Sequence, residues 1–205
     1  YTMKLKAKLI STAVVAAFGS VAGTAHAVNL GQDGQGQVLI YPYYSAQTKG
    51  STTMDTYVTI VNSDPVYGKA VKVRFIEGKA SREVLDFNLY LSPNDMWTAA
   101  VTRNSDGNPI LRTTDTSCTA PEITLNAGTG VREAPFVNYD YLGDAVKDDS
   151  LARAKEGYVE VIQMADLESG VLTAGAKFDT FKAAKHASGV PANCAGLAAA
   201  WNTGG

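Results

Sequence analysis

Apolar and polar residues alternate through much of the region from residue 36 to about residue 112, in short runs separated by turn residues. The clearest run covers residues 85–91, where every second residue is apolar. Runs with the same period begin at Val71 and at Trp97. A period of two residues is typical of a β-strand with one buried face. The pattern therefore predicts several half-buried strands.

The alternating positions predict one buried set and one solvent-facing set. The buried set is Val71, Val73, Phe75, Leu85, Phe87, Leu89, Trp97 and Val101. The residues expected on the opposite face are Lys72, Arg74 and Asp86. Because a shift of one residue would turn every apolar member toward solvent, the pattern also predicts the strand register.

Two further segments, residues 38–44 and 56–61, are apolar, aromatic or β-branched without clear alternation. The continuous apolar run of the first suits a strand buried on both faces. Alternatively, Pro42 suits a strand at a sheet edge, because proline has no amide to donate to a neighbouring strand. Turn residues rich in Asn, Asp, Gly and Pro separate the strands. Their spacing predicts a mainly β fold, an antiparallel immunoglobulin-like β-sandwich.

The rest of the chain is less regular. The pattern weakens over residues 113–146, which predicts a long loop. A short helix is expected over residues 150–156 with Ser150 as its N-cap, followed by a strand over 158–164. Helices are expected over residues 178–187 and 192–201, as a helical decoration at the C-terminal side.

The N-terminal residues have the pattern of a secretory signal peptide. Three lysines precede an apolar run of about fourteen residues, and Ala25 and Ala27 form a small-x-small cleavage pattern. The run is shorter than the roughly 20 residues that span a bilayer, so a membrane anchor is the weaker alternative. We expect residues 1–27 to be removed and residues 28–205 to form one domain. Because the chain ends in turn residues, we also expect the natural chain to continue beyond Gly205.

Charge then limits the class of partner. Without Lys4, Lys6 and Lys8, the chain has 15 basic and 20 acidic residues, a net charge of −5. Nucleic acids and anionic membrane surfaces bind basic faces, so neither is expected as a partner. No later segment is apolar for long enough to span a membrane as a helix. We expect the protein in the periplasm, on the outer cell surface or outside the cell.

Two cysteines remain, Cys118 and Cys194. In an exported protein a single pair of cysteines most often forms a disulfide, so we expect these two to be bonded. Two free thiols are the alternative.

Candidate catalytic residues are few. His186 is the one histidine after residue 27, it lies in a basic segment expected to be an exposed helix surface, and no G-x-S-x-G motif accompanies it. One histidine and two paired cysteines leave no ligand set for zinc or copper. We expect no catalytic centre and no cofactor.

Two groups of polar side chains suggest metal chemistry only weakly. Asn104, Asp106 and Asn108 alternate around Gly107 in a manner similar to a calcium loop, but no bidentate carboxylate follows them, which favours a plain turn. Asp144, Asp148 and Asp149 form a second acidic cluster, which we expect to be a solvated surface.

Four tyrosines are a candidate ligand platform. Tyr41, Tyr43, Tyr44 and Tyr57 could present apolar faces and polar tips to sugar rings. The same residues also suit packing inside a sandwich and at a sheet edge, which is the interpretation we favour.

One stretch carries a resemblance. Residues 61–62, 69–75 and 83–93, with Trp97, resemble uncharacterised exported β-rich proteins of Gram-negative bacteria. The resemblance covers a minor part of the chain. It implies an extracytoplasmic β-rich protein and no catalytic residues.

Together these observations favour an exported, non-enzymatic surface, matrix or filament component, or a binding module. Its partner would be a second copy, another surface protein or a glycan. An extracytoplasmic hydrolase acting on carbohydrate, with carboxylates that the sequence does not locate, is the alternative from another class.

Overall fold

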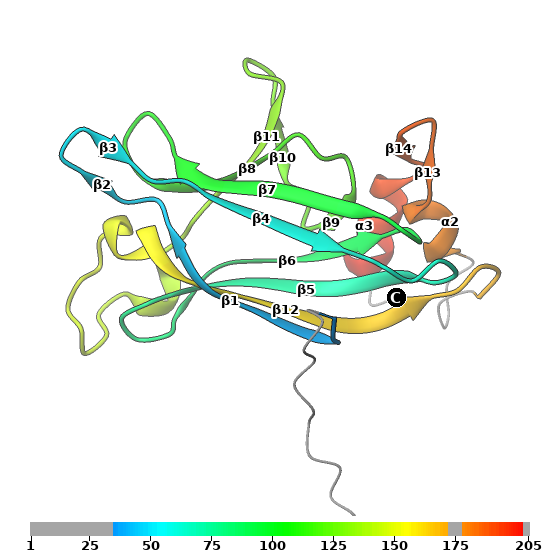
Figure 1. Ribbon diagram of the computed structural model, residues 1–205, viewed down its shortest axis with the longest axis horizontal. Coiled ribbons are helices and arrows are strands. Elements are labelled where there is room, and N and C mark those ends of the chain that lie inside the picture. Colours follow the sequence, from blue (N-terminus) through cyan, green and yellow to red (C-terminus); the bar gives the residue numbers. More distant parts are fainter. Residues whose placement is uncertain (1–34, 172–177, 203–205) are drawn as a thin grey trace, which may run out of the picture. The chain divides into compact units, whose positions relative to one another are not determined.

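Two five-stranded antiparallel sheets dominate the computed structural model (Figure 1). In spatial order, the first sheet contains β1 (Val38–Ser45), β12 (Glu156–Leu167), β5 (Gly68–Glu77), β6 (Glu83–Leu91) and β9 (Cys118–Ala120). The second contains β10 (Thr124–Asn126), β11 (Val131–Pro135), β8 (Pro109–Thr113), β7 (Met96–Arg103) and β4 (Thr56–Val61). The mainly β, antiparallel character expected from the alternating pattern is confirmed.

The structure describes residues 35–171 and 178–202. The predicted signal peptide, residues 1–27, lies outside the described residues. The elements outside the two large sheets are short. They are β2 (Thr48–Lys49), β3 (Thr52–Thr53), β13 (His186–Ala187), β14 (Val190–Pro191), the 3-10 helices η1 (Tyr139–Tyr141) and η2 (Leu151–Lys155), and the α-helices α2 (Thr180–Ala184) and α3 (Cys194–Asn202). None of the helices in the described ranges has the length and apolar character to cross a membrane.

The inner faces of the two sheets share one apolar core. Seven of the eight residues of the predicted buried set are buried in it, and the eighth, Leu85, is only partly buried and packs against it. Phe87 of β6 and Trp97 of β7 join the two sheets, with ring centroids 5.6 Å apart. The predicted opposite face is also confirmed, since Lys72 pairs there with Asp86, and Arg74 pairs with Glu83 and Glu160.

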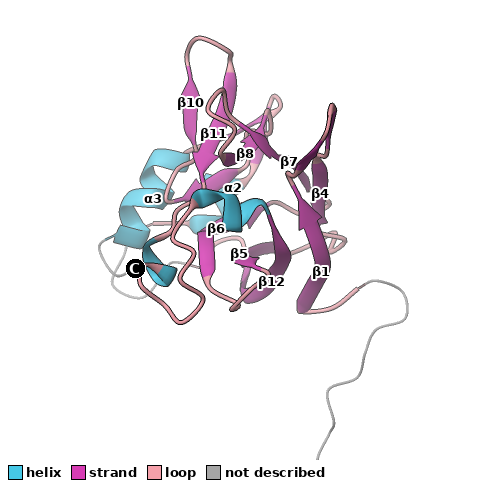
Figure 2. Cartoon of the chain, turned by 90° about the vertical axis from the view of Figure 1, so that its left-hand side faces the viewer, coloured by secondary structure: helices cyan, strands magenta, loops and turns pink. Residues whose placement is uncertain are grey.

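A second, smaller apolar cluster lies on part of the outer face of the first sheet. The helices α2 and α3 pack there beside β6 and β9 (Figure 2). Its buried members are Ala70, Tyr90, Cys118, Ala120, Leu167, Ala183, Ala184 and Leu197. The C-terminal helices expected from the sequence therefore pack on the first sheet.

Several expected boundaries are wrong. Residues 113–146 contain β9, η1 and the β10–β11 hairpin rather than one long loop. Residues 151–155 form a 3-10 helix, and Ser150 does not cap it, because its hydroxyl donates to Asp148 instead.

The expected helix over residues 178–187 is also too long. It ends at Ala184, because Ser188 and Gly189 adopt positive φ angles of 54° and 84° in a turn that pairs β13 with β14. Pro191 belongs to β14, and the last helix begins at Cys194.

Candidate functional site

A serine, an aspartate and a histidine meet where the β6–β7 turn contacts β13. His186 Nδ1 lies 2.9 Å from Ser92 Oγ and 3.4 Å from Asp95 Oδ2. The Ser92 hydroxyl donates to the same Asp95 oxygen at 3.0 Å. The expected exposed helical position of His186 is therefore wrong, because this side chain lies on a strand and is only 24% exposed.

These residue types match a Ser-His-Asp hydrolase, but their geometry differs. In that machinery the aspartate holds one ring nitrogen and the serine gives its proton to the other. Here Ser92 and Asp95 approach the same nitrogen, and the serine proton is directed at the aspartate. Asn62 also holds this turn, since its side-chain amide donates to Ser92 O at 2.8 Å. The arrangement suits a link between β13 and the turn rather than a nucleophile.

No local signal in the sequence could have indicated this cluster. Ser92 and Asp95 belong to an ordinary turn pattern, and His186 lies 94 residues further along the chain.

A buried ion cluster connects η2 with the β5–β6 turn. Arg153 Nη2 lies 3.0 Å from Glu77 Oε1 and 2.7 Å from Asp144 Oδ2. The guanidinium also lies over the Tyr141 ring, 4.4 Å from its centroid. Both the Arg153 and the Glu77 side chains are fully buried. Glu77 additionally accepts hydrogen bonds from the backbone amides of Lys79, Ala80 and Arg82.

The charges in this cluster stabilise one another. Burial disfavours the charged form of Glu77, but hydrogen bonds from Arg153 and from the turn amides outweigh it and lower the pKa of Glu77 to about 2. Hydrogen bonds to Asp144 and Glu77 raise the pKa of Arg153. Each group is ionised at neutral pH, which suits a structural network and not a proton donor.

The pKa shifts of the carboxylates in the described ranges also bear on the alternative that the protein is a carbohydrate hydrolase. A glycoside hydrolase needs a carboxylic acid whose pKa is raised so that it can protonate the leaving group. Every carboxylate with a resolved shift in the described ranges has its pKa lowered instead. These carboxylates are Asp64, Glu77, Glu133, Asp144, Asp148 and Asp179.

The candidate metal-binding groups have other partners. Asn104 Oδ1 accepts the backbone amides of Asp106 and Asn108, as in an ordinary hairpin turn. In the acidic cluster, Asp144 pairs with Arg153, Asp148 pairs with Lys79, and Asp149 accepts from the backbone of Gly143. The part of the chain that the structure describes contains no group of three His, Cys, Asp or Glu side chains arranged to hold a metal ion.

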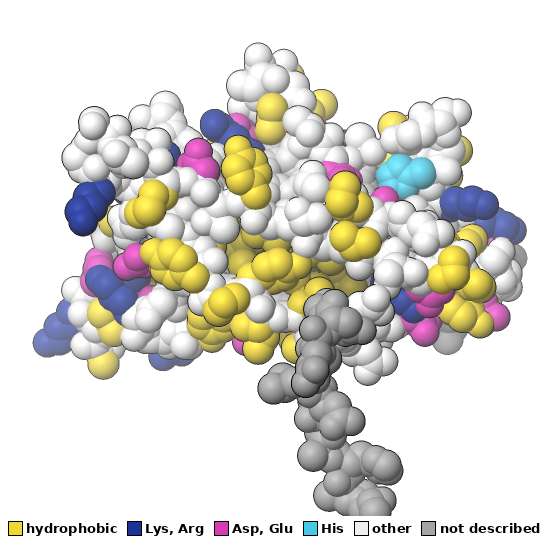
Figure 3. All heavy atoms as spheres, in the orientation of Figure 1, with side chains coloured by type: hydrophobic (Ala, Val, Ile, Leu, Met, Phe, Trp, Pro, Cys, Tyr) yellow, Lys and Arg dark blue, Asp and Glu magenta, His cyan; other side chains and the backbone are white. Residues whose placement is uncertain are grey.

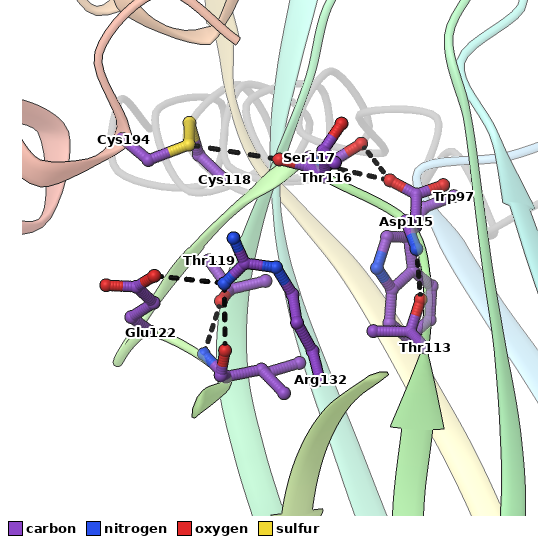
Figure 4. Close-up of a pocket in the computed structure, with 11 residues that line it drawn as sticks. Trp97, Thr113, Asp115, Thr116, Ser117, Cys118, Thr119, Glu122, Arg132 and Cys194 are labelled. Carbon is purple, nitrogen blue, oxygen red and sulfur yellow. Dashed lines mark hydrogen bonds and ion pairs between the residues drawn. A yellow bond between two sulfur atoms is a disulfide. The ribbon is translucent and has the colours of Figure 1, made fainter. Parts of the chain in front are cut away.

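The predicted disulfide is confirmed. Cys118 of β9 and Cys194 of α3 are bonded, with Cα atoms 5.0 Å apart. Figure 4 shows the hollow beside this bond, where Arg132 extends toward Glu122 and Asp115 lies close to Ser117. Its volume of about 10 Å³ accommodates no more than about one water molecule. The hollow is therefore too small for a ligand.

A larger hollow lies between the first sheet and α3. Its volume is about 300 Å³, and its walls are mostly apolar, including Met164, Leu167, Leu197 and Trp201. The rim carboxylate of Asp166 is held by Lys69 at 2.6 Å. The hollow offers apolar contact area rather than a catalytic constellation.

The structure separates the four tyrosines of the candidate platform. Tyr44 is fully buried and donates to Ala154 O, and burial raises the pKa of its hydroxyl. Tyr41 is half-buried and donates to Thr59 O at 2.5 Å. Tyr43 and Tyr57 are exposed, but they belong to different sheets. The four residues are therefore not brought onto one face.

Exposed apolar side chains also occur on the edge strand β4 and on the strand beside it. We define the edge surface as Tyr57 and Val61 of β4 and Met96 at the start of β7, which pairs with Val61; each is 54–81% exposed. β1 and β4 lie along the same side of the sandwich, one in each sheet, and apolar side chains gather between them (Figure 3). The hydrogen bond from the Tyr41 hydroxyl to Thr59 O joins β1 to β4 on this side.

Comparison with known proteins gives no match to a family model, to a curated protein or to a solved structure.

Proposed function

We propose that this protein is an exported, non-enzymatic β-sandwich that acts by association, as a surface, matrix or filament component or as a binding module. The edge surface carries the proposal, because the side chains of Tyr57, Val61 and Met96 are 54–81% exposed on one face at the edge of the second sheet. Clustered exposed apolar side chains mark interaction sites in soluble proteins. Unpaired edge strands also offer their backbone groups to another chain.

Other observations support export and the absence of catalysis. A disulfide such as Cys118–Cys194 persists in oxidising compartments outside the cytoplasm. The Ser92–Asp95–His186 cluster has the serine proton directed at the aspartate, and the resolved carboxylate pKa shifts run opposite to those of a general acid.

We also propose that the sandwich is a variant of the immunoglobulin-like type. β4 pairs with β7, while the two strands between them along the chain, β5 and β6, pair in the other sheet next to β12. Crossing between sheets by successive strands is characteristic of such sandwiches. The pairing of β1 with β12 and the added β10–β11 hairpin would be departures from the simple pattern.

The experiment tests the full-length protein, in the form that the cell produces after processing, for association and for catalytic activity. Light scattering over a concentration series and binding to a glycan panel should show association with a second copy, another surface protein or a glycan. A panel of glycan and ester substrates should show no turnover.

Ser92→Ala and His186→Ala test the remaining catalytic candidate directly. A strict monomer that hydrolyses a glycan or an ester, with the activity lost in either variant or on replacing one carboxylate, would establish the hydrolase alternative.

A further inference from the structure

The four edge strands of the two large sheets differ in how well they are protected from pairing with another chain. β1 contains Pro42 and has a shift in register between Tyr41 and Tyr44. β9 and β10 are only three residues long, and β9 is buried beside α3. Prolines, bulges, short length and covering elements are the usual devices that prevent edge pairing.

β4 has no proline, no bulge and no short length, and the Tyr41 hydroxyl of β1 contacts its outer edge at Thr59 O. Its six residues pair with β7 without any shift in register, and they include no proline and no charged residue. The sequence of the strand is Thr-Tyr-Val-Thr-Ile-Val, in which every residue is β-branched or aromatic. Such residues favour strand pairing.

The backbone of β4 presents alternate residues to the outside of the sheet. Asn62 N, just after the strand, donates to Asp95 O just before β7, so even-numbered residues direct their backbone groups toward β7. Thr59 O accepts the Tyr41 hydroxyl from the opposite side, which places odd-numbered residues at the outer edge. The outward backbone groups therefore belong to Tyr57, Thr59 and Val61.

This edge is complementary to itself. In an antiparallel pair centred on Thr59, Tyr57 would lie opposite Val61 of the second copy, and Thr59 opposite its own counterpart. Aromatic–β-branched and Thr–Thr pairs are both favourable across antiparallel strands. On the inner face, Val58 would lie opposite Ile60 of the second copy, which continues the apolar core layer.

The charges near the strand are also compatible with self-pairing. β4 itself carries no charge, so no like charges face each other across the pair. The nearest acidic residues are already neutralised, since Asp55 pairs with Arg103 and Asp64 pairs with Lys69.

We propose that β4 is a dimerisation edge that pairs antiparallel with β4 of a second copy, in register about Thr59. The inference rests on the proposed function and names its partner. Thr59 O keeps a second lone pair beside its hydrogen bond from Tyr41, and this lone pair accepts the amide of the second Thr59. Because the two copies use the same surface, the contact closes at two copies and does not propagate into a filament.

Thr59→Lys tests the register. The Thr59 side chain is exposed, so the substitution leaves the monomer intact but places two lysines directly opposite each other in the pair. Sedimentation velocity on the full-length protein should show a monomer–dimer equilibrium, with the dissociation constant raised at least about 100-fold in Thr59→Lys. The matched control is Thr98→Lys, which adds the same charge beside Thr59 on β7, one strand inside the edge. It should dimerise like the unsubstituted protein.

A charge-reversed mixture tests the two-fold arrangement. Thr59→Glu alone should also be monomeric, whereas an equimolar mixture of Thr59→Lys and Thr59→Glu should form a heterodimer. Circular dichroism and thermal unfolding show whether each variant remains folded.

Three results would overturn the inference. They are a wild-type monomer at all concentrations, a Thr59→Lys dimer of undiminished affinity, and a mixture that stays monomeric. If the protein nevertheless binds a glycan or associates through another surface, the proposed function stands without this edge. If it is a monomeric hydrolase, both proposals fail.

Discussion

Glu77 closes the β5–β6 turn and neutralises Arg153 at the same time. Its carboxylate accepts three backbone amides and one guanidinium hydrogen bond in a site from which water is excluded. Breaking a buried pair by removing one partner is costly, because the remaining charge loses its compensation. At the scale of single residues, we therefore expect substitutions in this cluster to be strongly destabilising.

Glu77→Gln should destabilise the protein by about 3–5 kcal/mol at pH 7, measured by chemical denaturation. The folded-state pKa of Glu77 is about 2, below its ordinary value of 4.5. The contribution of Glu77 to the stability of the folded protein is therefore fully present above pH 4.5 and is lost as the pH falls toward 2. The variant should lose less stability over this acidic range than the unsubstituted protein. Glu122→Gln, at an exposed ion pair, is the control and should change stability by less than about 0.5 kcal/mol. Equal effects of the two substitutions would contradict a structural role for the buried cluster.

At the scale of elements, β6 organises both faces of the first sheet. Its inner residues Phe87, Leu89 and Leu91 enter the main core, while Tyr90 on its outer face enters the cluster beneath the helices. The disulfide then joins β9, which pairs with β6, to α3. Core packing and one covalent bond thus hold the helical segment on the sheet.

Phe87→Ala should reduce stability by about 3–5 kcal/mol, because the ring is 1% exposed and contacts Trp97 in the centre of the core. Urea denaturation followed by tryptophan fluorescence measures this loss. Leu125→Ala on β10 removes an exposed side chain of similar character and should have little effect. A near-neutral Phe87→Ala would mean that the strand does not form the core as described.

Replacing both Cys118 and Cys194 by alanine should cost about 4 kcal/mol in the chain-entropy description, since the bond links positions 76 residues apart. Hydrogen exchange should rise most in α2 and α3, because the disulfide is their covalent attachment to the first sheet. The unsubstituted protein under reducing conditions is the comparison. Unchanged thermal stability and unchanged exchange in both helices would show that apolar packing alone holds them.

At the scale of the whole molecule, the proposed export sets which form of the chain is expected in the mature protein. Processing is predicted to remove residues 1–27, so the protein recovered from an exporting bacterial host should begin at Val28. N-terminal sequencing or intact mass measures the start. Ala27→Leu should block cleavage because signal peptidase requires a small residue there, whereas Asn29→Ala beyond the junction should be processed normally. Protein that still begins at Met3 would contradict the signal peptide.

Local rules were sufficient for the alternating strands and for the buried set around Phe87, but not for β9, β10 and β11, which lie in a segment predicted as a loop. Side chains on a strand point alternately to its two faces, so the period of two residues around Phe87 identified the buried set without any knowledge of the neighbouring strands. The disulfide was predictable because only two cysteines were available in a chain that is expected to be exported.

Pairing between segments that are distant along the chain decided the strand order and the side-chain clusters. β12 lies between β1 and β5, more than 70 residues away from either along the chain, and no local pattern specifies that position. Contacts between segments that are far apart along the chain also bring His186 to Ser92 and place Arg153 beside Glu77. The candidate site depends equally on strand order, since the sequence of β4 predicts a strand but only the assembled sheet leaves it at an edge. The sequence by itself therefore determined the alternating strands and which of their faces is buried, because side-chain alternation is local. The tertiary structure alone decided which strand is exposed to a partner, because that depends on pairing between distant segments.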